Sequence, residues 1–417
     1  MRVGRGTEPG GRYLMAGRHG KNKVAAGLGL VGAGASVFFA AAALATGSAA
    51  PARADFEDLL DPIVQPILTS LTDSIAVFDP AAALDLTSWA DSLLASLNSS
   101  FDFALPSADS AVAAASTGAE PAAAATSYTL PITMQIVTEP TIQAAIGAGD
   151  PSTLLVDTGS SGLVVPWQDL GSNDFSALEE LFKLGMPDNY GFSGYSGGVE
   201  YLYLTYNDVP VDYGTDGTEV LSTTSPVDVE VLSWSTNPAN IFENFQSFLS
   251  GNHVDGILGI GPDTAGPTDS PFESYGGVLV DLVGPEKSLI VGGDNPLTGG
   301  TWLDGSPTVG PLTETVTHNG VVTGTGIITN DLDSGGVYGT IPSSIAHSGV
   351  AQGDTISVYN GSTLLYSYQV GTDSINQSTA PTVISGTDID SGVVPFLNHE
   401  AYFDYATDKT YWGPLTS

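Results

Sequence analysis

Residues 154–166 read Leu-Leu-Val-Asp-Thr-Gly-Ser-Ser-Gly-Leu-Val-Val-Pro. An apolar segment delivers Asp157 into a short turn, and a second apolar segment leaves that turn. Two apolar runs of this length, separated by a tight turn, predict two buried β-strands. Gly159 lets the backbone approach its neighbours closely, while Thr158 and Ser160 supply hydroxyls that can orient the acid. The pattern predicts a carboxylate held in a structured loop between two core strands.

A second segment repeats this design 176 residues later. Residues 325–336 read Thr-Gly-Ile-Ile-Thr-Asn-Asp-Leu-Asp-Ser-Gly-Gly, so that Asp333, Ser334 and Gly335 follow an apolar run. The separation suits one aspartate from each of two lobes. Two carboxylates held about 3 Å apart cannot both ionise, so they share one proton. The ionised member can take a proton from water, and the protonated member can donate to a scissile carbonyl oxygen.

Four further strings accompany the two aspartate loops. They are His-Val-Asp-Gly-Ile-Leu-Gly-Ile-Gly at 253–261, Ser-Leu-Ile-Val-Gly-Gly at 288–293, Tyr-Ser-Gly-Gly at 195–198 ahead of Val-Pro-Val at 209–211, and the closing segment 394–413. With these strings the chain resembles the pepsin-like aspartic peptidase family over about 128–417. The resemblance implies a mainly β, two-lobed pepsin-like acid protease fold. It also implies the following site: catalytic Asp157 and Asp333, loop support from Thr158, Gly159, Ser160, Ser334 and Gly335, and a flap with Tyr195, Ser196 and Gly197.

More narrowly, the chain resembles the mycobacterial cell-surface aspartic proteases associated with PE-PGRS proteins. The features shared are an Ala/Gly-rich leader, the absence of cysteine and the Asp-Ser-Gly second loop. The sequence departs from them in showing no PE domain and no Gly-Gly-Ala repeat tract, so we expect a conventional signal peptide instead. Gly336 is a second departure, because the pepsin-like family usually has Ser or Thr there. We therefore expect Asp333 to lack one outer hydrogen bond.

Composition divides the chain into four segments. A basic start, an apolar stretch and Ala52-Arg53-Ala54 predict a signal peptide over 1–54. Apolar residues at helical spacing predict a short helical extension over 55–103, and an Ala/Ser/Pro-rich linker follows over 104–127. Alternating strands and turns then mark the protease domain, 128–417, with a first lobe of about 128–296 and a second of about 297–417.

The net charge of the chain restricts the classes of molecule that it can bind. Residues 55–417 carry three Lys and no Arg against 45 acidic residues, a formal net charge of −42. Such a surface repels nucleic acid and anionic lipid. With no cysteine, disulfides and thiolate metal sites are excluded. We expect a monomer without metal or cofactor, with no stable membrane span after processing, that acts on polypeptides. The expected location is secreted or at the bacterial cell envelope.

Four other sequence patterns allow alternative interpretations. Tyr190-Gly191 also looks like a flap turn, and Asp390-Ser391-Gly392 is another Asp-Ser-Gly. The latter leaves too few residues behind it for the rest of a lobe, which favours a turn opening the last hairpin. Ser334 would be the nucleophile of a trypsin-like loop, but no histidine lies in a suitable context upstream. The spacing Asp331-x-Asp333-x-Gly335 is a calcium-loop fragment without its distal ligands.

The sequence thus predicts an exported aspartic endopeptidase that cleaves surface or secreted proteins by a two-aspartate, water-activating mechanism. The alternative function is a catalytically inactive pepsin-like binding module at the cell surface.

Overall fold

The computed structural model describes residues 126–195, 198–215, 218–237, 243–262, 264, 266–347 and 349–415. The described residues within 126–180 and 188–415 belong to one compact unit. The expected signal peptide, the expected helical extension and all but the last two residues of the expected linker lie outside the described residues.

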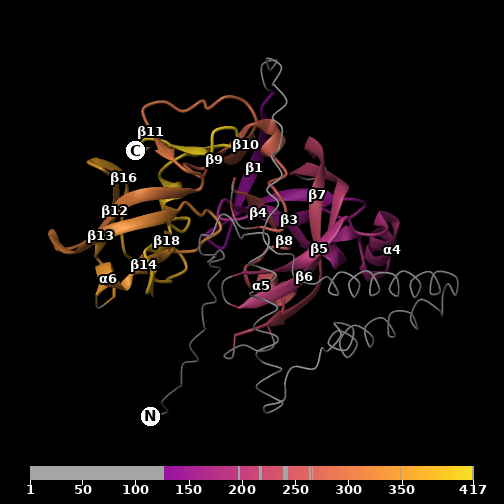
Figure 1. The fold of residues 1–417 in the computed structure, drawn as a ribbon, viewed down its shortest axis with the longest axis horizontal. Helices are drawn as coiled ribbons and strands as arrows, with labels where there is room; N and C mark the ends of the chain where they lie inside the picture. The colour runs from indigo at the N-terminus through magenta and orange to yellow at the C-terminus, as the bar shows by residue number, and fades with distance from the viewer. Residues whose placement is uncertain are drawn as a thin grey trace, which may run out of the picture. The chain divides into compact units, whose positions relative to one another are not determined.

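One sheet contains 13 of the 20 strands of the described chain, in the order β11-β20-β19-β9-β10-β1-β2-β3-β8-β4-β7-β6-β5 (Figure 1). Its strands are β1 (Tyr128–Gln135), β2 (Glu139–Ile146), β3 (Ser152–Asp157), β4 (Ser161–Pro166), β5 (Asn189–Tyr195), β6 (Val199–Thr215), β7 (Thr218–Ser235), β8 (Gly256–Ile260), β9 (Gly277–Asp281), β10 (Lys287–Val291), β11 (Thr301–Asp304), β19 (Ala401–Asp404) and β20 (Lys409–Trp412).

A five-stranded sheet, in the order β16-β15-β12-β13-β18, carries the second aspartate loop. Its strands are β12 (Thr308–His318), β13 (Val321–Asp331), β15 (Thr355–Asn360), β16 (Thr363–Gln369) and β18 (Asp388–Asp390), and β14 (Thr340–Pro342) pairs separately with β17 (Thr382–Ile384). The helical segments are η1 (Trp167–Leu170), α4 (Asp174–Leu184), α5 (Phe245–Gly251), η2 (Glu273–Tyr275), α6 (Ser343–Ala346) and η3 (Val394–Leu397). The predicted mainly β fold is confirmed.

The centre of the large sheet is the trio β3, β8 and β4. β8 runs parallel to β3 and antiparallel to β4. Every residue of β8 and β4 is buried, which accounts for the continuous apolar runs of the sequence. A Cβ atom at Gly259 would lie 2.6 Å from the Ser161 backbone, so a glycine is needed where β8 passes the start of β4. This packing fixes the backbone on both sides of the first aspartate loop.

The five-stranded sheet repeats one part of that arrangement. β18 runs parallel to β13, with Thr329, Asn330 and Asp331 opposite Asp388, Ile389 and Asp390 respectively. In the large sheet β8 lies beside β3 in the same parallel sense. Each aspartate loop therefore emerges from a strand that has a parallel neighbour from later in the chain.

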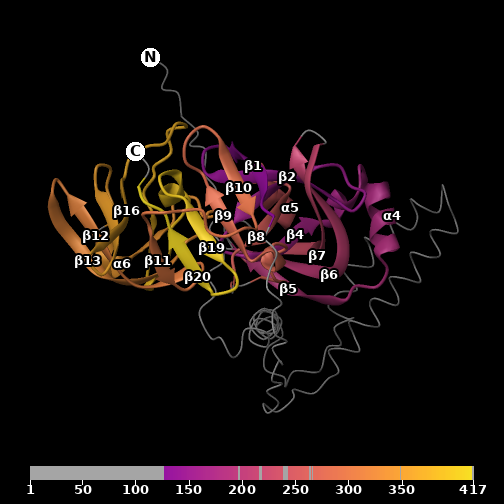
Figure 2. The same cartoon turned by 90° about the horizontal axis from the view of Figure 1, so that it is seen from above.

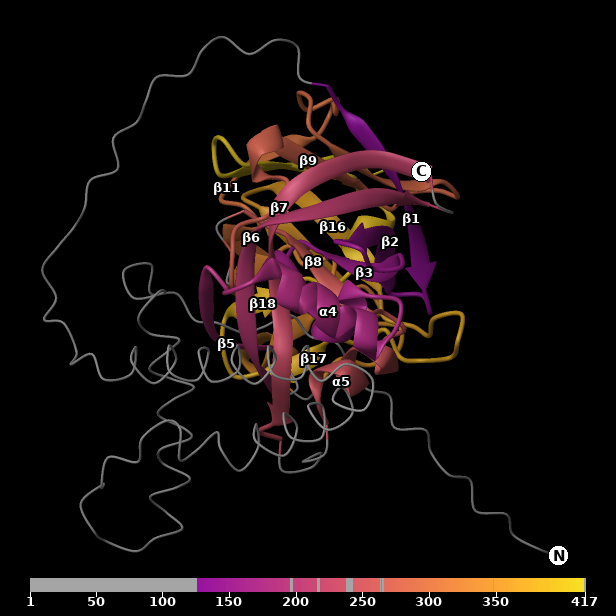
Figure 3. The ribbon, with the colours of Figure 1, turned by 90° about the vertical axis from the view of Figure 1, so that its right-hand side faces the viewer.

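Two hairpins complete the surroundings of the site. β5 and β6 pair antiparallel from Asn189 opposite Thr205 to Tyr195 opposite Val199, and β6 continues alongside β7 (Figure 3). β19 and β20 form the closing hairpin, and β19 also pairs with β9 (Figure 2). Trp412 of β20 is among the largest fully buried side chains. None of the helices in the described part of the chain has the length and apolar character needed to cross a membrane.

Candidate active site

The first loop supplies a hydrogen-bond donor to each oxygen of Asp157. This residue ends β3, and only 2% of its surface is exposed. Oδ1 accepts a hydrogen bond from the Gly159 N–H at 2.8 Å, and Oδ2 accepts one from the Ser160 hydroxyl at 2.6 Å. Because both oxygens have donors, the loop favours the ionised carboxylate.

The second loop supports Asp333 less evenly. This fully buried residue lies two positions beyond β13. Its Oδ1 accepts hydrogen bonds from the N–H groups of Gly335 at 2.7 Å and Gly336 at 3.0 Å, and its own N–H donates to Ser391 Oγ at 3.0 Å. Its Oδ2 receives no N–H or hydroxyl donor among the described residues. The two loops therefore differ at the outer oxygen, as the glycine at position 336 led us to expect.

Thr158 and Ser334 tie the two loops together by reciprocal hydrogen bonds. The Thr158 hydroxyl donates to the Leu332 carbonyl at 2.6 Å and accepts from the Ser334 N–H at 2.8 Å. The Ser334 hydroxyl donates to the Val156 carbonyl at 2.7 Å and accepts from the Thr158 N–H at 3.2 Å. Both side chains are fully buried, so this four-bond connection holds the carboxylates in a fixed relation. It also engages the hydroxyl of Ser334, which argues against that residue as a nucleophile.

Gly159 and Gly335 each make room for the aspartate of the opposite loop. A Cβ atom at Gly159 would lie 2.5 Å from Asp333 Cγ, and one at Gly335 would lie 2.7 Å from Asp157 Cγ. Real Cβ atoms do not approach neighbours that closely, so any larger residue would displace a carboxyl group. The glycines of the two motifs are thus required by the contact between the loops.

Burial raises the pKa of both carboxyl groups, but to different degrees. For Asp157, hydrogen bonds from Asp333, Ser160 and Gly159 oppose the effect of burial on the pKa. For Asp333, the negative charges of Asp390, Asp157 and Asp331 add to the effect of burial, so its pKa lies well above the usual range. The two side chains also hydrogen-bond to each other, so they titrate as a pair. The donors on both oxygens of Asp157, and the lack of a donor to Asp333 Oδ2 among the described residues, favour Asp333 as the member that holds the shared proton.

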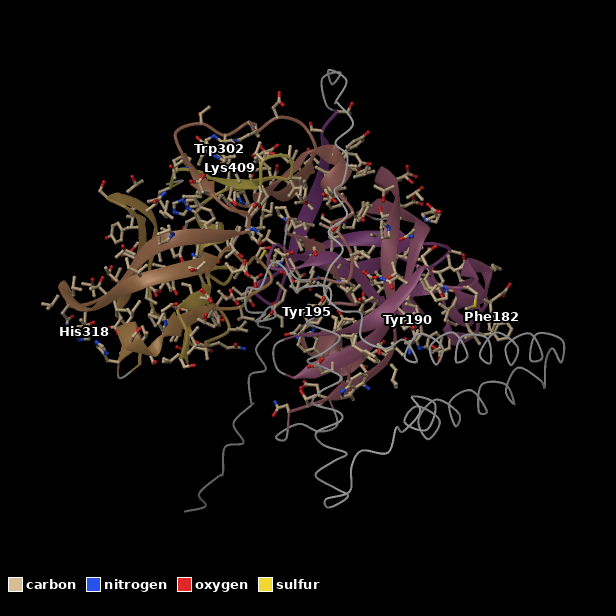
Figure 4. All side chains as sticks on the ribbon, viewed as in Figure 1. Phe182, Tyr190, Tyr195, Trp302, His318 and Lys409 are labelled. Carbon is tan, nitrogen blue, oxygen red and sulfur yellow. The ribbon has the colours of Figure 1, made fainter. Side chains whose placement is uncertain are left out.

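The candidate flap residue Tyr195 ends β5 at the tip of the hairpin with β6. Its ring stacks on those of Tyr201, Phe245 and Phe248, with centroids 5.8 to 5.9 Å apart. Burial, followed by Tyr201 and the Asp157 charge, raises its pKa well above the usual value, which keeps the phenol neutral. Tyr190 lies inside β5, away from the hairpin tip (Figure 4). Ser196 and Gly197 lie outside the described residues.

Sequence reasoning missed one residue of the site, Asp390. A Cβ atom at Gly336 would lie 2.6 Å from Asp390 Oδ1, so this carboxyl group stands directly against the second loop. The Asp390-Ser391-Gly392 segment does precede the closing hairpin, but Ser391 also accepts the hydrogen bond from the Asp333 backbone. The signal that could have found it is Gly392, which follows a strand parallel to β13, much as Gly259 lies in a strand parallel to β3. Among the described residues, no group of His, Asp and Glu side chains is arranged to hold a metal ion.

The fold and the paired loops define the class of protein. The crystal structure of the aspartic proteinase from Irpex lacteus matches 70% of this chain and 98% of its own, with a TM-score of 0.50 and 14% sequence identity. The predicted pepsin-like fold is therefore confirmed. The family model of the PE-PGRS C-terminal aspartyl peptidase-like domain matches residues 128–411, and the chain belongs to this family.

Curated mycobacterial relatives agree with this assignment. PE cleavage protein A of Mycobacterium tuberculosis is 35% identical over 301 residues, 67% of this chain and 50% of the relative. PE cleavage protein A of Mycobacterium marinum is 34% identical over 303 residues, 68% of this chain and 51% of the relative. The chain thus spans about half the length of the curated relatives it matches.

Proposed function

We propose that this chain is an exported aspartic endopeptidase in which Asp157 and Asp333 form the catalytic pair. The observation that supports this most directly is the contact between two buried carboxyl groups, 2% and 0% exposed, that hydrogen-bond to each other. A binding module would gain nothing from two buried acids, because burying them costs free energy. Membership of an aspartyl peptidase-like family supports the same proposal.

The asymmetry of the pair supports different chemical roles for the two carboxyl groups. Ionised Asp157, with donors on both oxygens, takes a proton from a water molecule, and that water attacks the scissile carbonyl carbon. Asp333 gives its proton to the carbonyl oxygen, which produces a tetrahedral diol. Asp157, now protonated, then transfers its proton to the amine as the C–N bond breaks, while a diol hydroxyl returns a proton to Asp333, which leaves a carboxylic acid product and restores the one-proton pair. The pair is active while it holds one proton, so activity falls when the second carboxyl group ionises at higher pH.

Thr158, Gly159, Ser160, Ser334 and Gly335 act by holding the carboxyl groups in this geometry. Tyr195, Ser196 and Gly197 form the proposed flap, which closes over an extended peptide and excludes water from the reacting atoms. The proposed substrates have apolar residues near the cleaved bond.

The proposed substrates are surface or secreted polypeptides. The mycobacterial relatives are named for PE cleavage, so PE-containing proteins are the first substrates to test. The proposed location is the cell envelope or the medium, and the proposed state of the chain is a monomer. The expected signal peptide at 1–54 is the feature that motivates the location. Fractionation of the producing cell, with mass spectrometry of the N-terminus, tests it.

A mixed peptide library, incubated with the full chain between about pH 3 and 8, tests the activity. The expected result is cleavage that is best in acid, is blocked by pepstatin and disappears in Asp157→Asn. Asp157→Asn keeps the shape of the carboxyl group, and a thermal melt checks that the variant is folded. Cleavage that persists in Asp157→Asn would overturn the catalytic assignment. Specific capture of a partner without any cleavage would favour the binding module.

A further inference from the structure

A third carboxyl group, that of Asp390, fills the space that a side chain at position 336 would need. A Cβ atom built on Gly336 would lie 2.6 Å from Asp390 Oδ1, 2.8 Å from Oδ2 and 3.0 Å from Cγ. In the first loop the equivalent position, three residues after the aspartate, is Ser160, whose hydroxyl donates to Asp157 Oδ2. The carboxyl group of Asp390 therefore occupies the place in the second loop that corresponds to the Ser160 hydroxyl in the first.

Strand register shows that the first lobe has no counterpart of this acid. Two residues before Asp157, the pairing of β3 with β8 puts Leu155 opposite Ile257, and both are buried. At the same offset in the second loop, the pairing of β13 with β18 puts Asp331 opposite Asp390. A pair of apolar side chains would pack here at a lower free-energy cost than two acids, because burying an acid costs free energy unless it is hydrogen-bonded. The acid is thus expected to have a hydrogen-bonding role.

The backbone holds Asp390 firmly beside the second loop. Its N–H donates to Thr340 Oγ1 at 2.9 Å, and its Oδ1 accepts from the Gly392 N–H at 2.7 Å. Its Oδ2 is buried and has no donor among the described residues, which is also true of Asp333 Oδ2. Both carboxyl groups lie against Gly336, whose N–H donates to Asp333 Oδ1 at 3.0 Å and whose Cβ position is 2.6 Å from Asp390 Oδ1. Two neighbouring buried carboxyl oxygens without donors can pair only if one of them carries a proton.

We propose that Asp390 carries a proton and donates an O–H···O hydrogen bond to Oδ2 of Asp333, as a positioning residue for the second catalytic carboxyl group. This inference rests on the proposed peptidase function. The proton stays on Asp390 throughout the reaction. When Asp333 gives its own proton to the substrate carbonyl oxygen, its carboxylate becomes charged, and hydrogen bonds to charged acceptors are the stronger ones. The hydrogen bond from Asp390 therefore lowers the activation free energy of hydrolysis more than it strengthens substrate binding.

The surroundings of Asp390 keep it protonated in acid. The titratable groups that interact with it are Asp157, Asp333, Tyr366 and Tyr368, and Asp331 faces it from β13. All of these are acids or phenols. Burial raises the pKa of Asp390 to about 7, opposed by the Gly392 N–H and reinforced by the Asp157 charge. Above about pH 7 the group becomes an anion beside Asp333, the donor is lost, and activity declines.

A double-mutant cycle in the full chain tests the inference. Asp390→Ala should lower kcat about 10- to 100-fold, with KM changed less than about threefold, because one hydrogen bond to a charged group is lost. It should also alter the alkaline limb of the pH–rate profile. Gly336→Ser alone should lower kcat as much, because its Cβ would overlap Asp390. The double variant should regain at least about tenfold over Asp390→Ala, since the serine hydroxyl then has room to donate to Asp333.

Matched variants separate positioning from general damage. Asp388→Ala, an exposed position of the same strand, should leave kcat and the pH–rate profile unchanged. If Asp390→Ala does not fold, Asp390→Asn keeps an N–H donor. Its kcat should then stay within about tenfold of the wild type, and its alkaline limb should lose the Asp390 titration.

The inference is overturned if Asp390→Ala keeps the wild-type kcat and alkaline limb. It is also overturned if Gly336→Ser is as harmful without Asp390 as with it. Absence of cleavage by the wild type would instead defeat the proposed function. In that case the double-mutant cycle is measured by thermal unfolding. Gly336→Ser should lower Tm when Asp390 is present and should not lower it in the Asp390→Ala background.

Discussion

The connection between Thr158 and Ser334 gives a quantitative prediction for Thr158→Val. Valine keeps the shape of threonine but loses the hydroxyl that donates to the Leu332 carbonyl at 2.6 Å and accepts from the Ser334 N–H at 2.8 Å. All three residues are fully buried, so water cannot replace the lost partner. A buried unpaired group costs about 1–3 kcal/mol. Two such groups should lower the free energy of unfolding by about 2–6 kcal/mol, a large part of the stability of a typical domain.

Urea unfolding of three variants measures this effect. Thr158→Ser keeps the hydroxyl and loses one methyl group, so it should cost only about 1 kcal/mol. Thr410→Val is the matched control, because Thr410 is also fully buried and its hydroxyl bonds Gly305 O at 3.1 Å and Ser306 Oγ at 3.2 Å. It should lose stability but keep kcat, whereas Thr158→Val should lose both.

Two results would refute this reasoning. Equal stability of the Thr158→Val and Thr158→Ser variants would mean that the hydrogen bonds between the loops contribute little. Equal kcat in the Thr158→Val and Thr410→Val variants would mean that the connection stabilises the fold without positioning the carboxyl groups.

Raising the pH from about 4.5 to 8 should lower Tm, because burial raises the pKa of Glu314 to about 8 and the folded chain then holds a proton that the unfolded chain has released. Glu314→Gln should flatten this decline in a pH series of thermal melts, and the exposed Glu286→Gln should leave it unchanged. Gly335→Ala should lower kcat about 100-fold, because its Cβ would lie 2.7 Å from Asp157 Cγ. Gly371→Ala, whose Cβ would meet nothing closer than 4.0 Å, should cleave peptides at the wild-type rate.

The aspartate loops could be predicted from the sequence because their signal is local. Each loop is a run of apolar residues, an acid and a glycine turn within about a dozen positions, and these patterns follow from strand burial and turn geometry. The mainly β fold was predictable for the same reason. Tyr195 was placed at a hairpin tip by its spacing to the returning strand, and the structure has it beside that tip.

The contacts between the loops could not be predicted in this way. The Thr158–Ser334 hydrogen bonds join residues 176 positions apart, and nothing in either motif specifies that distance. The position of Asp390 was harder still to predict, because it depends on the register of β18 against β13. The length of chain behind Asp390-Ser391-Gly392 excluded it as a catalytic loop, but it gave no reason to place the carboxyl group beside Asp333.

The two carboxyl groups differ through two substitutions that act together. Where the first loop has Ser160, the second has Gly336, so the outer oxygen of Asp333 has no hydroxyl donor. Where β3 and β8 place a buried apolar pair, β13 and β18 place Asp331 opposite Asp390, so the second loop lies against a third carboxyl group. Adding the hydroxyl alone would force a side chain into the space of Asp390, and removing Asp390 alone would leave the outer oxygen unpaired. Only changing both positions at once would give the outer oxygen of Asp333 a serine donor like the one that Ser160 provides to Asp157.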